Sequence, residues 1–300
     1  MPVVSTVDAV CWRSLFDEAR QRLAGTDGVD SSDIDARRIV EAAAGAAPAE
    51  FESVLDEPAT KRAAAWFYSM LERRGAGEPL QYVVGSWSFR TLDLMVDRRV
   101  LIPRPETEVV AGLAADEVAS RSDAPGGDRE VIVADLGTGS GAIALSVAAE
   151  CPAARVYATD VSADALAVAS ANLAGLGRAA ARVTLHEGDW FEALPGALQG
   201  SIDVVVSNPP YIGTGEELPA VVADWEPAVA LWSGPTGREA VEQVVGGASR
   251  WLRPGGALIM EVASHRAKES AGLVAGAGFG EVRLERDLAG LERVVMARLP

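Results

Sequence analysis

Residues 131–141 read VIVADLGTGSG, an apolar run that leads into three closely spaced glycines. The apolar run predicts a buried strand, and the glycines allow the backbone to turn tightly and to approach a ligand where a Cβ would collide. A helix is expected over residues 142–150. A loop in this position lies at the carboxyl edge of an α/β sheet, beside a helix N-terminus, where ligands bind. The stretch therefore predicts a ligand-binding turn at the edge of an α/β sheet.

The chain after this loop alternates between short apolar runs and helical patterns, which predicts an α/β fold with a doubly wound, mostly parallel sheet. The last two apolar runs are separated only by a short loop, so we expect an antiparallel pair to close the sheet. The expected strands cover residues 155–159, 183–186, 202–207, 257–262, 281–284 and 293–298, and the next helix covers residues 163–173.

The first seventy-odd residues show helical spacing instead. Apolar residues from Trp12 to Leu23 recur every three or four positions, and Ser31 and Ser32 are candidate caps of a second helix. Nothing in this region gathers catalytic residue types, so we interpret it as a small recognition or packing domain. A further helix is expected from Thr60 to Arg74, with Trp66, Phe67, Met70 and Leu71 on one side.

Between these two regions the apolar period changes to two. Leu92, Leu94 and Val96 occupy alternate positions, which predicts a strand in a hairpin that begins near Tyr82. A proline-bracketed turn and a helix over residues 107–120 follow. The chain is therefore predicted to have three parts, namely a helical domain over residues 1–77, a β-hairpin linker over residues 78–102 and the α/β domain over residues 103–300.

The charge balance bears on the class of partner. The chain has 43 acidic and 27 basic residues, a formal net charge of −16. Proteins that bind duplex DNA or RNA usually neutralise phosphates with Lys and Arg, so no long nucleic-acid footprint is expected. A local basic patch is still compatible with this total, and the acidity can equally serve solubility alone.

Cysteine usage and the N-terminal sequence predict a reducing, cytoplasmic setting. Cys11 and Cys151 do not make a disulfide framework, and with only His186 and His265 besides, a zinc site has too few soft ligands. We therefore expect no metal. The N-terminus lacks a basic segment followed by an apolar stretch, and no apolar run is long enough to cross a bilayer.

The glycine loop alone leaves two kinds of cofactor open. It suits S-adenosylmethionine, and it also satisfies a relaxed dinucleotide fingerprint, with Asp160 at about the expected distance. Asp160 can accept both ribose hydroxyls, or it can cap the following helix, a role that Ser162 could also fill. Asp189 can meet an adenine amino group while Trp190 packs on the base; a loop end and a core anchor are the alternative. The candidate cofactor residues from the pattern are Gly137, Thr138, Gly139, Ser140, Gly141, Asp160, Asp189 and Trp190.

Residues 207–211 read SNPPY and directly follow the fourth expected strand. The two prolines fix the backbone and remove two donors, which leaves rigid carbonyl acceptors. The side-chain oxygen of Asn208 and the carbonyl of Pro209 can together accept both hydrogens of an NH2 group, and Tyr211 offers an aromatic face to a planar acceptor. We predict catalysis by positioning and electrostatic stabilisation of an in-line transfer. A proline-stiffened turn is the structural alternative. The candidate catalytic residues are Asn208, Pro209 and Tyr211, and Pro210 joins them in the candidate substrate site.

The two motifs, DLGTGSG over residues 135–141 and NPPYI over residues 208–212, together resemble amino-methyltransferases with a seven-stranded Rossmann-like sheet. Other segments narrow this resemblance to the HemK/PrmC family. They are RR at 73–74, EPLQY at 78–82, VLIPRPETE at 100–108, WEP at 225–227, LRPGG at 252–256 and DLAG at 287–290. The resemblance spans nearly the whole chain and is strong from Arg73 onward.

This resemblance implies a class I methyltransferase sheet with a small N-terminal helical domain and S-adenosylmethionine as cofactor. The family methylates the side-chain amide of the glutamine in the Gly-Gly-Gln motif of peptide chain release factors. The helical domain would then recognise the factor away from that motif, and residues 103–108 would help to enclose the site. By similarity, Gly137 to Gly141, Asp160, Trp190 and Asn208 would contact the cofactor, and Asn208 to Tyr211 would hold the glutamine.

One segment departs from the family pattern. Residues 262–266 read VASHR and lack the glycine and glutamine expected of family members. His265 could invite a general-base role. We interpret it as a loop residue, because the proton of the methylated amide can leave to water after transfer.

Three other functions share parts of this pattern. A nucleic-acid N-methyltransferase would use the same cofactor and acceptor residues, but it would need phosphate-binding surface that this acidic chain offers poorly. A catalytically silent binding or scaffold protein has no need of the paired acceptors at Asn208 and Pro209. A dinucleotide oxidoreductase would need an acid or base for hydride transfer, which nothing near the loop supplies.

Overall fold

The structure, a computed structural model, describes residues 10–123 and 129–300, and its contacts divide the chain into two compact units. The first unit comprises Met1–Ser86 together with Pro219–Trp225. The second comprises Trp87–Leu218 and Glu226–Pro300. A short segment of the α/β half of the sequence therefore belongs to the helical unit.

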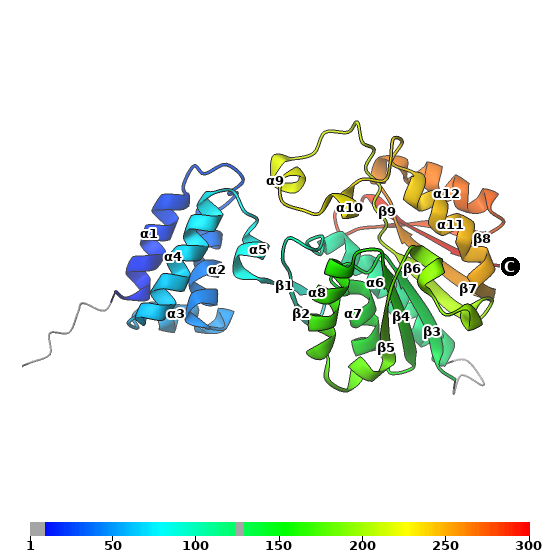
Figure 1. Cartoon of the computed structure of the whole chain (residues 1–300), viewed down its shortest axis with the longest axis horizontal. Coiled ribbons are helices and arrows are strands. Elements are labelled where there is room, and N and C mark those ends of the chain that lie inside the picture. The colour runs from blue at the N-terminus through cyan, green and yellow to red at the C-terminus, as the bar shows by residue number, and fades with distance from the viewer. Residues whose placement is uncertain (1–9, 124–128) are drawn as a thin grey trace, which may run out of the picture. The chain divides into compact units, whose positions relative to one another are not determined.

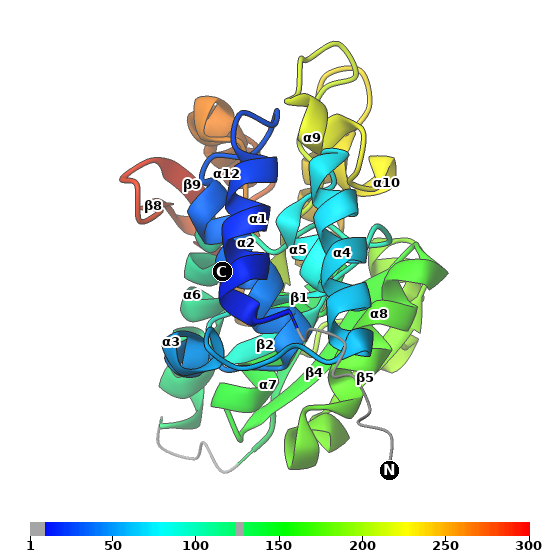
Figure 2. The same ribbon diagram turned by 90° about the vertical axis from the view of Figure 1, so that its left-hand side faces the viewer.

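The first unit is helical, and α1, α2 and α4 pack against one another in it (Figures 1 and 2). Its core contains fully buried side chains from all three helices, including Leu15, Ile39 and Phe67. The helices are α1 (Trp12–Leu23), α2 (Ser32–Ala44), α3 (Phe51–Val54), α4 (Lys61–Gly75), α5 (Leu80–Val84) and α9 (Ala220–Ala223), with a 3-10 turn η1 (Pro48–Glu50) before α3.

Three details of this region differ from the sequence prediction. Ser31 alone caps α2, because its hydroxyl accepts from the Ile34 N–H at 3.4 Å and Ser32 is already helical. Trp66 is 48% exposed, since the 100° step per residue turns it away from the stripe that contains Phe67. Tyr82 lies in α5 and not in the hairpin, because the prolyl turn before Leu80 starts a short helix.

The second unit contains a seven-stranded sheet with the order β5-β4-β3-β6-β7-β9-β8. The five strands from β5 to β7 are parallel, and β9 runs antiparallel to both β7 and β8. This order confirms the predicted class I methyltransferase sheet. The strands are β3 (Val131–Leu136), β4 (Ala154–Asp160), β5 (Val183–Glu187), β6 (Ile202–Ser207), β7 (Leu252–Glu261), β8 (Gly280–Arg286) and β9 (Glu292–Arg298).

Helices cover both faces of this sheet (Figure 1). Alternate residues of β6 show the division, since Val204 and Val206 belong to the core that includes α6 and α7, and Val205 belongs to the core that includes α11 and α12. The helices are α6 (Pro105–Ser122), α7 (Ala142–Glu150), α8 (Ala163–Ala174), α10 (Ala228–Leu231), α11 (Glu239–Trp251) and α12 (Ala267–Gly276). The 3-10 turns are η2 (Gly177–Arg182), η3 (Trp190–Ala193), η4 (Gly196–Leu198) and η5 (Ser264–Arg266).

The start of one strand in this unit differs from the sequence prediction. Strand β7 begins at Leu252, five positions before the predicted start at Ala257, because the Arg-Pro-Gly-Gly letters that look like a turn lie within the strand at an irregular pairing with β6. The hairpin consists of β1 (Ser86–Phe89) and β2 (Leu92–Met95), which form a separate two-stranded sheet.

None of the helices within residues 10–123 and 129–300 combines the length and apolar character needed to cross a membrane. Cys11 and Cys151 are both free thiols.

A buried ion pair connects α2 and α4 in the first unit. The Arg74 Nε donates to Asp35 Oδ2 at 2.6 Å, and the two residues are only 4% and 6% exposed. The remaining guanidinium nitrogens donate to the carbonyls of Glu78 and Gly28. Each guanidinium nitrogen therefore has a hydrogen-bond acceptor, and the carboxylate has its counter-charge, as a buried ion pair requires.

We expect Asp35→Ala to destabilise the helical unit by about 3–5 kcal/mol, because it leaves a guanidinium buried without its counter-charge. Hydrogen–deuterium exchange of α2 and α4 peptides in the full chain would measure the loss. The matched control is Asp33→Ala in the same helix, whose exposed pair with Arg20 contributes at most about 1 kcal/mol. Equal effects of the two substitutions would contradict the assignment.

Candidate functional site

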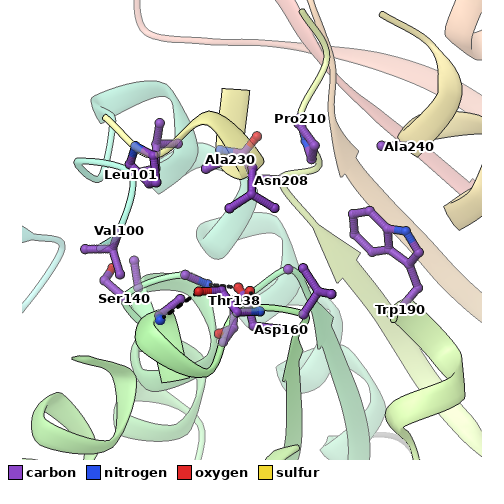
Figure 3. A pocket seen from close by; sticks show the side chains of 18 of the residues that line it. Val100, Leu101, Thr138, Ser140, Asp160, Trp190, Asn208, Pro210, Ala230 and Ala240 are labelled. Carbon is purple, nitrogen blue, oxygen red and sulfur yellow. Dashed lines mark hydrogen bonds between the residues drawn. The ribbon is translucent and has the colours of Figure 1, made fainter. Parts of the chain in front are cut away.

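A cavity of about 310 Å³ lies at the carboxyl ends of β3 to β6 in the second unit. Figure 3 shows Asn208 and Pro210 on one side of it, with Thr138 and Asp160 on the other. Gly141, Pro209 and Tyr211 adjoin this lining along the chain but do not form part of it. The sequence-predicted residues that line it are Gly137, Thr138, Gly139, Ser140, Asp160, Asp189, Trp190, Asn208 and Pro210.

The glycine loop needs its glycines at two positions above all. Gly137 has a φ of +72°, and a Cβ there would lie 3.3 Å from the Trp190 ring. Gly141 has a φ of +86° at the N-cap of α7, where a Cβ would lie 3.0 Å from the Leu145 side chain. Both conformations favour glycine. The loop can therefore pass close to both the aromatic ring and the helix start.

A buried carboxyl lies beneath this loop. Asp135 Oδ2 accepts from the Thr138 hydroxyl at 2.6 Å and from the Ala144 N–H at 3.1 Å. Asp135 is 0% exposed, and burial raises the pKa of its carboxyl to about 7. Its hydrogen bonds connect the end of β3 to the loop and to the first turn of α7. Asp135 thus fixes the loop without lining the cavity.

Asp160 connects the glycine loop to the end of β4. Its Oδ2 accepts from the Gly139 N–H at 2.8 Å, and its Oδ1 accepts from the Ser162 N–H at 2.9 Å. Burial raises the pKa of this carboxyl. The cap of α8 is Ser162, whose hydroxyl accepts from the Ala165 N–H at 3.2 Å. Asp160 is consequently free of the capping role and presents its carboxylate to the cavity.

Trp190 forms another side of the cavity with an unusual backbone. Its φ is +42°, in the left-handed region that a bulky residue rarely adopts. The indole Nε1 donates to Gln243 Oε1 at 2.7 Å, which holds the ring beside Gly137. Asp189 is exposed at the rim.

Gln243 also lines the cavity. The sequence analysis did not identify it, because it lies on α11 among ordinary helix-forming residues.

Asn208 follows β6, whose last residue is anchored by a hydrogen bond from the Ser207 hydroxyl to the Leu136 carbonyl at 2.7 Å. The Asn208 Nδ2 donates to Thr107 Oγ1 at 3.2 Å. Thr107 belongs to the segment of residues 103–108 that the sequence analysis expected to enclose the site, and Pro103, Arg104 and Thr107 do line the cavity.

Tyr211 lines a second cavity of about 230 Å³. Burial raises the pKa of its phenol to about 12, so the ring is neutral near pH 7. The Arg266 guanidinium donates to the Tyr211 carbonyl at 3.3 Å and to Glu216 Oε1 at 2.7 Å, and that carboxylate accepts from the Gly213 N–H at 2.8 Å. Arg266 thus anchors the loop after Tyr211, whereas the neighbouring His265 is exposed.

Glu226 fixes residues 102–104, of which Pro103 and Arg104 line the cavity. Its Oε2 accepts from the Ile102 N–H at 3.1 Å, and its Oε1 accepts from Arg104 at 2.5 Å. The hairpin is held nearby, because the Asn172 side chain bonds both the N–H and the carbonyl of Met95 and also the Ser140 carbonyl. The Asp160 carboxylate, the Trp190 ring and the Asn208 amide therefore line one cavity.

Comparisons with known proteins match both parts of the chain to family models. The methyltransferase small domain matches residues 125–224, and the PrmC N-terminal domain matches residues 14–85. The chain is similar to a solved structure described as a release-factor-specific protein-(glutamine-N5) methyltransferase from Alicyclobacillus acidocaldarius. That likeness has 27% identity and a TM-score of 0.39, and covers 66% of this chain and 94% of that chain.

Two curated relatives match over nearly the full length. The release factor glutamine methyltransferase of Cereibacter sphaeroides is 40% identical and covers 93% of this chain and 95% of its own length. That of Moorella thermoacetica is also 40% identical and covers 95% of this chain and 97% of its own length. At this identity and coverage, the chain belongs to the family of release factor glutamine methyltransferases.

Proposed function

We propose that this chain transfers the methyl group of S-adenosylmethionine to the side-chain nitrogen, N5, of the glutamine in the Gly-Gly-Gln motif of peptide chain release factors. The observation that carries the proposal is the position of Asn208, which lines the same cavity as the glycine loop. A cofactor bound along that loop and an amide bound by Asn208 would therefore be neighbours. Family membership agrees with this reading.

The cavity fits an adenosine-containing cofactor. Its volume of about 310 Å³ falls within the range of small-molecule sites. Each carboxylate oxygen of Asp160 accepts one backbone N–H, which leaves lone pairs for two ribose hydroxyls. The Trp190 face beside Gly137 would hold the adenine, with Asp189 near its amino group. S-adenosylmethionine, when bound, supplies an activated methyl group on a sulfonium.

The residues of the 208–211 segment would bind and orient the acceptor. An amide nitrogen is a poor nucleophile because its lone pair is delocalised into the carbonyl. Two acceptors, Asn208 Oδ1 and the Pro209 carbonyl, would attract the two amide hydrogens and stabilise the charge that develops during transfer. Tyr211, a neutral phenol near pH 7, would add an aromatic face without a competing charge.

The first experiment measures methyl transfer from labelled S-adenosylmethionine to a purified, unmodified release factor. We expect label on the factor and none on a version whose Gly-Gly-Gln glutamine is changed to Ala. A nucleic-acid sample serves as the third arm. Label on nucleic acid alone would overturn the substrate assignment and would leave the cofactor site standing.

Three single substitutions should rank the groups around residues 208–211, here called the acceptor loop. Asn208→Ala should lower kcat by about 10²-fold, because it removes one acceptor of the developing charge. Arg266→Ala should lower kcat about tenfold, because the Tyr211 carbonyl and Glu216 lose a charged hydrogen-bond donor. His265→Ala, at an exposed neighbouring position, should stay within about twofold of wild type. Steady-state kinetics measures all three, and a His265→Ala loss as large as that of Asn208→Ala in a folded protein would refute the loop assignment.

The helical unit would recognise the factor at a distance from the glutamine. Deleting or exchanging residues 1–75 should then raise the Michaelis constant for the whole factor far more than that for a short Gly-Gly-Gln peptide, because only the factor reaches both units. The two Michaelis constants measure this directly. Equal increases for both substrates would contradict a recognition role.

A further inference from the structure

Three residues that are far apart in the sequence meet next to the acceptor loop. Asn208 follows β6, and Glu261 ends β7, where the parallel register pairs Ser207 with Met260 and so brings Asn208 and Glu261 to adjacent strand ends. Thr107 lies in the first turn of α6. It is 101 positions from Asn208 and 154 from Glu261. The sheet edge and the helix start together form this cluster.

The hydrogen bonds in the cluster have a defined direction. Asn208 Nδ2 donates to Thr107 Oγ1 at 3.2 Å, and the Thr107 hydroxyl donates to Glu261 Oε2 at 2.7 Å. A hydroxyl has one proton, and the ionised carboxylate can only accept. The Thr107 hydroxyl must therefore donate its hydrogen bond to Glu261. Its oxygen then acts only as the acceptor of the hydrogen bond from Asn208. The opposite amide orientation would place two oxygen acceptors against each other.

We infer that Thr107 and Glu261 are positioning residues that fix the side-chain amide of Asn208 with its nitrogen toward Thr107 and its oxygen free for the substrate amide. This inference rests on the proposed function, in which Asn208 Oδ1 accepts from the glutamine. We call the two successive hydrogen bonds, from Asn208 to Thr107 and from Thr107 to Glu261, the relay. Without it, the oxygen and nitrogen of the Asn208 amide could exchange places by rotation about one bond. A nitrogen in place of the oxygen would then present donors to an NH2 group that has only donors to offer.

Burial makes the relay specific to the folded site. Thr107 is 4% exposed and Glu261 is 0% exposed, so water does not compete for the two hydrogen bonds. The second carboxylate oxygen, Glu261 Oε1, has no hydrogen-bond partner among the described residues. A buried carboxyl with one unpaired oxygen is costly for stability. It is therefore an unusual choice for a purely structural strand end.

The charge of Glu261 gives the relay a pH dependence. Arg104 and Glu106 face it from the start of α6, Arg293 from β9 and Tyr211 from the acceptor loop. Burial is the largest influence and raises the pKa of Glu261 to about 7. Above that pH the carboxylate accepts only and the direction is enforced. Below it the carboxyl can donate to Thr107, whose proton is then free to face Asn208, and the direction is no longer fixed.

A matched pair of substitutions at Thr107 tests the relay. Thr107→Val keeps the shape and removes the hydroxyl, and it should lower kcat for release factor about tenfold or more. Thr107→Ser keeps the hydroxyl and should restore kcat to within about threefold of wild type. Steady-state kinetics with the release factor measures kcat for both variants.

The outcomes separate the relay from general packing. A loss in Thr107→Val that Thr107→Ser restores supports the relay, whereas equal losses in both variants, or none in either, would overturn it. A wild-type enzyme that does not methylate the factor would instead refute the proposed function, and the Thr107 comparison would not be reached. The two failures are therefore distinguishable.

The pH profile gives an independent readout if a Thr107 variant folds poorly. For wild type, we expect kcat to fall as the pH decreases through about 7. Glu261→Gln cannot titrate, and its amide can turn either an acceptor oxygen or a donor nitrogen toward Thr107, so the direction is not enforced at any pH. It should have a lower kcat than wild type at pH 8 and should lose the acid-side decline. An acid-side decline that persists unchanged in Glu261→Gln would show that another group controls it, and would overturn the role of Glu261.

Discussion

Parallel pairing of β6 with β3 on one side and β7 on the other determines where three segments of the candidate site begin. The registers align Leu136 with Ser207 and Ser207 with Met260. The three strands consequently end at one edge, and the glycine loop, Asn208 and Glu261 emerge side by side. The hydrogen bond from Ser207 to the Leu136 carbonyl fixes that edge locally. A slip of one residue would reverse the faces on which these side chains lie.

The sequence predicted the parts of the site that depend on local chemistry. Three closely spaced glycines after an apolar run can be identified without a structure, because their conformations follow from the missing Cβ. The Asn-Pro-Pro-Tyr segment is likewise specific, because prolines restrict the backbone wherever they occur. The mostly parallel sheet with an antiparallel pair at its end agreed with the alternation of apolar and helical patterns, which leaves few topologies, whereas the seven-stranded order was implied by the family resemblance.

The remaining parts depend on contacts between distant residues, which no local pattern contains. Gln243 acquires its role only because α11 brings it to the Trp190 indole. Thr107 looked like one more residue of a proline-bracketed turn until the sheet placed it between Asn208 and Glu261. Arg266 lies in a segment that departs from the family letters, yet its guanidinium anchors the loop after Tyr211. Tyr82 was misassigned because its helix is only five residues long and gives too short a pattern to read.

The two buried carboxyls near the strand ends, Asp135 and Glu261, make the folding stability of the second unit depend on pH. Each has a pKa raised to about 7 by burial, from ordinary values of 3.8 and 4.5. A carboxyl whose folded-state pKa is raised contributes stability at low pH that is lost as the pH rises from its unfolded value to its folded one. Between these pKa values the carboxyls ionise in the unfolded chain and stay largely protonated in the fold, so the second unit loses folding free energy as the pH rises over this range. The same carboxyls that hydrogen-bond the glycine loop and Thr107 make the fold less stable at the pH where they are ionised.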